Sequence, residues 1–139
     1  VLEATAEQIA PAEIDRTFDN VSRQDAARFR SEGRRYMARW EQEPGSAGKR
    51  ESWRIVRSLA GIDAKGVPST GDKLMRAKPM AAQAEVGNVY LLAGRWNERW
   101  LQHMHAQPDY PHDDEMDAAG GALQDLTGPR DTQARSYQG

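Results

Sequence analysis

The residues best suited to chemistry are acidic side chains in two places far apart in the chain. Glu41 stands at the end of an apolar, strand-like stretch. The segment His112-Asp113-Asp114-Glu115-Met116-Asp117 holds four acids within five positions. Carboxylates held this close repel one another unless a divalent cation binds between them, and hard oxygen ligands suit Mg²⁺ or Mn²⁺. If the fold brings the two places together, Glu41 supplies the side of a metal site opposite Asp114.

The spacing within the second group leaves the choice of ligands open. In a helix that begins here, Asp113 and Asp117 share a face at i,i+4, and Asp114 and Asp117 are neighbours at i,i+3. Acids in a first turn also stabilise a helix simply by facing its dipole, and acids at strand ends are often ordinary turn residues. His112, beside these acids, is a candidate auxiliary base or orienting group.

Two other motifs are weaker candidates for a site. His103 and His105 are two positions apart and face different directions on a predicted helix, so we expect both to be exposed to solvent. The segment 44–49 resembles a phosphate-binding loop only superficially, because Glu43 takes the place of its first glycine and Arg50 that of its hydroxyl residue. We therefore expect an ordinary turn before a helix.

Composition excludes several classes of protein. The chain has 139 residues and no cysteine, which excludes disulfides, thiol catalysis and thiolate zinc sites. No apolar stretch is long enough to cross a membrane, so we expect no membrane partner. A net charge of −2 excludes an overall polycation, although 19 lysines and arginines leave room for a local basic face.

Apolar periodicity predicts helices that alternate with short strands. Helices are expected over 11–32, 49–60, 70–86, 96–104 and 112–126, and strands over 35–41, 64–68 and 89–92. In the second helix, Trp53, Val56, Leu59 and Ala60 are expected on the buried face. We expect residues 1–126 to form one α/β domain with a largely parallel sheet, and residues 127–139 to form a flexible tail.

Four segments in order resemble the C-terminal nuclease domain of bacteriophage large terminases. They are WEQEPGSAGK at 40–49, GDKLMRAKP with AAQ and EVGNV across 71–89, GRWN at 94–97, and HDDEMDA at 112–118. The resemblance spans residues 11–126. It implies an RNase H-like fold, in which helices flank a central, largely parallel mixed sheet, and a two-metal endonuclease that cuts concatemeric double-stranded DNA during packaging.

The resemblance also implies roles for individual residues. Three acids in this family hold two Mg²⁺ or Mn²⁺ ions; Glu41 matches the second acid and Asp114 the third, with Asp113 or Asp117 as alternative or accessory ligands. Candidates for contacts with DNA phosphates are Lys49, Lys73 and Arg76, although such residues also occur on ordinary solvated helix faces. No acid upstream of Glu41 is centred in an apolar strand, so we expect the first strands and first acid to be missing and cleavage to be weak or absent.

Partners and alternatives follow from the same resemblance. The expected partners are double-stranded DNA, the portal, the small terminase subunit and the ATPase domain of the same protein, in the cytoplasm of a bacterial host. One alternative is a non-catalytic DNA- or protein-binding module that keeps the RNase H-like fold. Another is a junction-resolving nuclease, because the spacing of Asp114, Asp117 and Ala118 is similar to that of resolvases with this fold.

Overall fold

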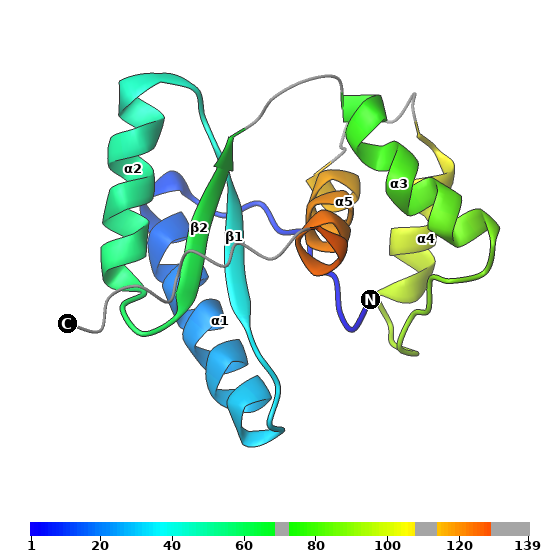
Figure 1. The fold of residues 1–139 in the computed structure, drawn as a ribbon, viewed down its shortest axis with the longest axis horizontal. Helices are drawn as coiled ribbons and strands as arrows, with labels where there is room; N and C mark the ends of the chain where they lie inside the picture. The colour runs from blue at the N-terminus through cyan, green and yellow to red at the C-terminus, as the bar shows by residue number, and fades with distance from the viewer. Residues whose placement is uncertain (69–72, 108–113, 129–139) are drawn as a thin grey trace. The chain divides into compact units, whose positions relative to one another are not determined.

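The structure is a computed structural model that describes residues 1–68, 73–107 and 114–128. Within these ranges, five helices and two strands follow one another in the order α1-β1-α2-β2-α3-α4-α5 (Figure 1). The predicted α/β class is therefore confirmed. The chain divides into two compact units. We call Ala6–Gly71 the sheet unit, and Val1–Thr5 with Asp72–Gly139 the helical unit.

The sheet unit is built around one strand-helix-strand crossover. β1 (Met37–Gln42) and β2 (Asp63–Pro68) pair in parallel, from Met37 opposite Asp63 to Gln42 opposite Pro68. Parallel strands cannot be joined by a tight turn, and α2 (Gly45–Ser58) makes the crossover between them. The strands predicted over 35–41 and 64–68 are thus confirmed, but no antiparallel strand joins them among the described residues, so the sheet is smaller than expected.

One face of β1 carries the core of the sheet unit. The Trp40 ring meets Phe18 of α1 (Pro11–Ser31) edge-on, with 5.7 Å between ring centroids. The Trp40 indole N–H donates to Ser52 Oγ of α2 at 3.1 Å. Ala38, on the same face of the strand, is buried, as is Leu59 just after α2. Alternation along a strand then places Glu41 on the opposite face.

Two glycines allow α2 to approach its neighbours closely. A Cβ on Gly66 of β2 would lie 2.4 Å from Ser52 Oγ, and a Cβ on Gly48 would lie 2.0 Å from the Glu43 carbonyl oxygen. Residues 45–48, predicted as a turn, therefore form the first turn of α2, because Gly48 lets that turn close on the preceding loop. The helix begins four residues earlier than the predicted 49.

The predicted buried face of α2 is wrong in part. Leu59 is buried, but Trp53 is 68% exposed and Val56 and Ala60 are also exposed. The buried residues of the helix are instead Gly48, which faces the Glu43 backbone, and Ser52, which faces the strands. A small residue occupies the position of Ser52 because α2 lies too close to Gly66 to accommodate an indole there.

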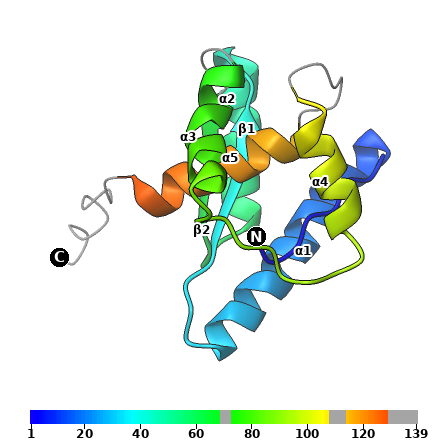
Figure 2. The same cartoon turned by 90° about the vertical axis from the view of Figure 1, so that its right-hand side faces the viewer.

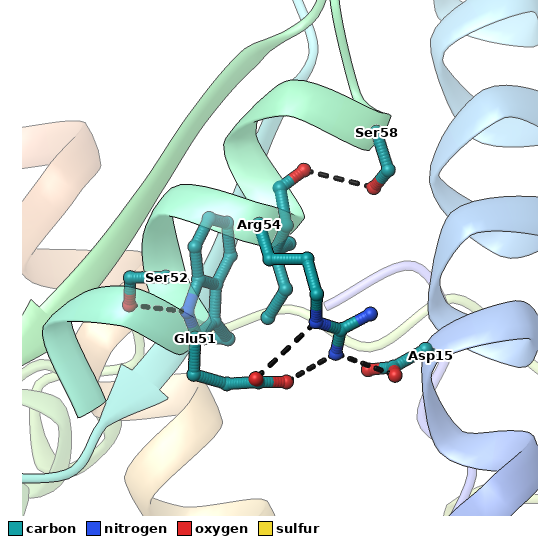
Figure 3. A network of polar contacts seen from close by, with 7 residues as sticks. Asp15, Glu51, Ser52, Arg54 and Ser58 are labelled. Atoms are coloured by element: carbon teal, nitrogen blue, oxygen red, sulfur yellow. Dashed lines mark hydrogen bonds and ion pairs between the residues drawn. The ribbon is translucent and has the colours of Figure 1, made fainter. Parts of the chain in front are cut away.

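A surface ion network joins α1 to α2 (Figure 3). Arg54 donates to the Glu51 carboxylate on its own helix and to Asp15 Oδ2 on α1 at 2.5 Å. The hydrogen bonds to Glu51 and then to Asp15 raise the pKa of Arg54 above its ordinary value. All three side chains are about half exposed, so the network aligns the two helices more than it stabilises them.

The helical unit contains α3 (Lys73–Glu85), α4 (Asn97–His105) and α5 (Asp114–Thr127). In Figure 2, α5 (orange) crosses α3 (green), and the two helices pack together. Met80 of α3, Trp100 of α4 and Gly120 of α5 are buried. Trp96 meets Trp100 edge-on, with 6.2 Å between the ring centroids.

The strand predicted over 89–92 is wrong. This segment is irregular, and Tyr90 and Leu92 are exposed. Its backbone makes two hydrogen bonds with Val1: the Val1 ammonium donates to the Tyr90 carbonyl at 2.6 Å, and the Leu92 N–H donates to the Val1 carbonyl at 3.0 Å. A β-rich composition produces a strand only where a neighbouring strand supplies a ladder, and these two bonds are too few. Residues 129–139 of the predicted tail lie outside the described residues.

We predict that Gly48→Ala destabilises the sheet unit by about 1–3 kcal/mol, because the added methyl overlaps the Glu43 carbonyl. Urea unfolding followed by circular dichroism measures the change. Gly121→Ala is the matched control: this helical glycine has open space around its Cβ position, so alanine should leave stability unchanged or raise it by up to about 1 kcal/mol. Equal effects of the two substitutions would contradict the close packing of α2.

Candidate metal site

Glu41 lies one residue before the end of β1, opposite Val67 of β2, with its side chain exposed. Its position follows from the packing of Trp40, which turns the next residue to the other face of the strand. Groups at the carboxyl ends of parallel strands are well placed to meet ligands. An exposed carboxylate at this position can therefore bind a cation without losing a protein partner in the core.

The second acidic position lies at the start of α5. Asp114 is the first residue of this helix and is exposed, while Asp117, three residues later, is half-buried. At this spacing the two carboxylates share a helix face. His112 and Asp113 lie outside the described residues, so their predicted roles stay predictions. In the part of the chain that the structure describes, no cluster of three or more acidic or histidine side chains could hold a metal ion.

Glu115 behaves differently from its acidic neighbours. Its side chain is only 8% exposed, and Arg99 of α4 approaches its Oε1 at 2.9 Å. Nδ1 of His103, one turn further along α4, contacts Oε2 of the same carboxylate. Glu115 is therefore held by α4, and we call its contacts with Arg99 and His103 the Glu115 clamp. The clamp fixes the rotation of α5 in the turn that carries Asp114 and Asp117.

The expectation that both His103 and His105 are exposed is wrong for His103. The His103 side chain is 21% exposed and contacts Glu115, whereas His105 is exposed as expected. His103 and Arg99 are four residues apart and so share a helix face. That spacing, opposite an acid near the start of the next helix, is the signal that predicts the clamp from sequence.

That the two acidic positions form one metal site stays a prediction. Glu41 belongs to the sheet unit, and Asp114 and Asp117 belong to the helical unit. Of the predicted DNA contacts, Lys49 is exposed in the first half of α2. Lys73 and Arg76 lie on α3, and their side chains lie outside the described part of the structure.

A comparison with known families identifies the chain. The model of the family described as Terminase RNaseH-like domain matches residues 12–126, which is most of the sequence. The chain belongs to this family. No curated protein and no solved structure shows a significant match.

The match confirms the resemblance to the terminase nuclease domain. It begins at the second residue of α1 and ends in α5, so β1 with Glu41 and α5 with Asp114 both fall inside the terminase domain. The family match indicates a nuclease-type domain with a general role in phage DNA packaging. Of the helices described, none is both long enough and apolar enough to span a membrane.

We predict that Glu115→Gln in this terminase domain lowers the free energy of unfolding by about 1–3 kcal/mol, because Arg99 and His103 lose a buried charged acceptor. Thermal or urea unfolding measures the loss. Glu98→Gln makes the same chemical change at an exposed site on α4 and should alter stability by less than about 0.5 kcal/mol. A loss of the same size in both variants would contradict the clamp.

Proposed function

We propose that this chain is a terminase nuclease domain that hydrolyses phosphodiester bonds of concatemeric double-stranded DNA with Mg²⁺ or Mn²⁺. The observation that carries the proposal is the family match over residues 12–126, which includes both acidic positions. The donor set supports it, because exposed carboxylates at a strand end and at a helix start are the ligands that these hard cations prefer.

Glu41 and Asp114 would hold the metal, with Asp117 or Asp113 as an accessory or alternative ligand. When bound, a pair of cations supplies an activated water and neutralises the leaving oxygen of the phosphodiester. The chain's own contribution is to hold its carboxylates at fixed positions: β1 presents Glu41, and the Glu115 clamp keeps the first turn of α5 in one orientation. His112 would orient a ligand or accept a proton nearby.

Basic residues would hold the DNA. Lys49, Lys73 and Arg76 would bind backbone phosphates, which positions a duplex without selecting its sequence. The nuclease domain would extend over residues 1–126, with residues 127–139 as a tail. Partners in this role would be the small terminase subunit, the portal and the ATPase domain of the same protein, in the cytoplasm of the bacterial host.

Only two of the three expected acidic positions can be assigned in this sequence, so we propose that cleavage by the 139-residue chain is slow. The same observation favours a second candidate function: a non-catalytic module that keeps the fold and binds DNA or another packaging protein. A junction-resolving nuclease is distinguished from both by a preference for branched DNA.

Calorimetry with Mn²⁺ tests the metal site. We predict that Glu41→Ala and Asp114→Ala each weaken Mn²⁺ binding at least about tenfold, because each removes a direct ligand. Glu98→Ala removes an exposed carboxylate from α4 and should leave binding unchanged. Binding that survives both ligand substitutions would contradict the assignment. A parent chain that binds no Mn²⁺ would favour the non-catalytic module.

A cleavage assay tests the reaction. We predict slow, Mg²⁺- or Mn²⁺-dependent cutting of linear duplex DNA that Glu41→Ala abolishes, while Glu98→Ala cuts at the parent rate. Gel analysis of linear duplex and four-way junction substrates at equal concentration measures both rates. Robust metal-dependent cutting that survives Glu41→Ala would contradict the proposed chemistry, and faster cutting of the junction would indicate a resolvase.

A further inference from the structure

An exposed tryptophan borders a shallow hollow in the sheet unit. Trp53 of α2 is 68% exposed, which is unusual for the largest apolar side chain. The hollow has a volume of about 240 Å³ and opens to solvent. The residues that line it come from the end of β1, from α2 and from β2: Gln42, Lys49, Ser52, Trp53, Val56, Ala64, Lys65 and Gly66.

Positive charge lies beside this hollow on α2. Trp53 lies four residues from Lys49 and four residues from Arg57, so the three side chains share a helix face, and Lys49 lines the hollow. Lys65 of β2 also belongs to the lining, but strand alternation directs its side chain to the face opposite Gly66, away from Trp53. Within the described residues, neither Lys49 nor Arg57 forms an ion pair. Since the whole chain has a net charge of −2, this basic face is a local concentration rather than a general property.

The lining suits a nucleobase, which has apolar faces and polar edges. The small residue Ala64 leaves room beside the indole, and the Gln42 amide offers both a donor and an acceptor at the edge of the hollow. Aromatic side chains stack on nucleobases of any sequence, and neighbouring cations bind the phosphates between them. A base inside a duplex is already stacked on its neighbours, so only an unpaired base can use Trp53 in this way.

We propose that the hollow binds a single-stranded segment of DNA, with an unpaired base stacked on Trp53 and the adjacent phosphates on Lys49 and Arg57. This rests on the proposed function for the choice of DNA as the nucleic acid. The site would retain a frayed or newly cut strand at the nuclease domain while the other strand leaves it. It adds Trp53 and Arg57 to the expected DNA contacts, and it gives Lys49 a defined place beside a stacked base.

Fluorescence anisotropy tests the site with a labelled 20-nucleotide thymidine strand and with a blunt duplex of equal length. EDTA is present throughout, so that neither divalent metal nor cleavage contributes. We expect the wild-type chain to bind the single strand more tightly than the duplex. Trp53→Ala should weaken single-strand binding about tenfold and duplex binding less than twofold, because the duplex offers no free base to stack. Trp53→Phe should restore most of the loss.

The basic residues should behave differently from the tryptophan. Lys49→Ala and Arg57→Ala should each weaken binding of both DNAs and reduce the slope of log affinity against log salt, because each removes one phosphate contact. The matched controls lie in the helical unit: Tyr90→Ala removes an exposed aromatic side chain and Lys78→Ala an exposed lysine. Neither control should change single-strand affinity by more than about twofold.

Three outcomes would overturn the proposal: no binding of the single strand, no effect of Trp53→Ala, or equal losses for single strand and duplex. Circular dichroism of Trp53→Ala checks that this exposed position is tolerated, and Trp53→Phe keeps the test valid if it is not. Because the assay contains no divalent metal, its result is separate from the metal site. If the wild-type chain binds no Mn²⁺ but Trp53→Ala still weakens single-strand binding, only the nuclease chemistry is contradicted. If the chain binds Mn²⁺ but Trp53→Ala does not change single-strand binding, only the single-strand site is contradicted.

Discussion

The close contact between α2 and the parallel strands is the constraint on which the sheet unit depends. Gly66 leaves the space that Ser52 occupies, and the Ser52 hydroxyl accepts the Trp40 indole N–H. This contact fixes which face of β1 is buried, and therefore which face carries Glu41. It also fixes the rotation of α2, and with it the positions of Lys49 and Trp53 beside the hollow that α2 forms with the strands. This one packing contact thus determines the positions of both the proposed metal ligand and the proposed DNA contacts.

The helical unit uses charge where the sheet unit uses close packing. Glu115 is nearly buried between Arg99 and His103, and so α4 determines how α5 is turned. The adjacent Asp114 stays exposed because its neighbour takes the structural role. The two neighbouring carboxylates therefore have different roles: Glu115 positions the helix, and the exposed Asp114 is the proposed metal ligand. The family match places both units inside a terminase RNase H-like domain.

Sequence reasoning found the features that depend on local pattern. Strands at 35–41 and 64–68 and the long first helix follow from periodicity alone. It missed features that depend on distant partners. The segment 89–92 has the composition of a strand but lacks a ladder, and the partner of His103 lies on the next helix. Trp53 looked like a core residue because periodicity cannot show that Gly66 brings the strand too close for an indole.

The proposed nuclease chemistry requires that Glu41 and the start of α5 bind the same cation. This can be measured by paramagnetic broadening of backbone amide signals in NMR spectra, recorded while Mn²⁺ is added below one equivalent. We predict that amides around Glu41 and around Asp114 broaden together, at the same Mn²⁺ ratio, and recover together when excess Mg²⁺ displaces the Mn²⁺. Broadening confined to the start of α5, with the end of β1 unaffected, would contradict it.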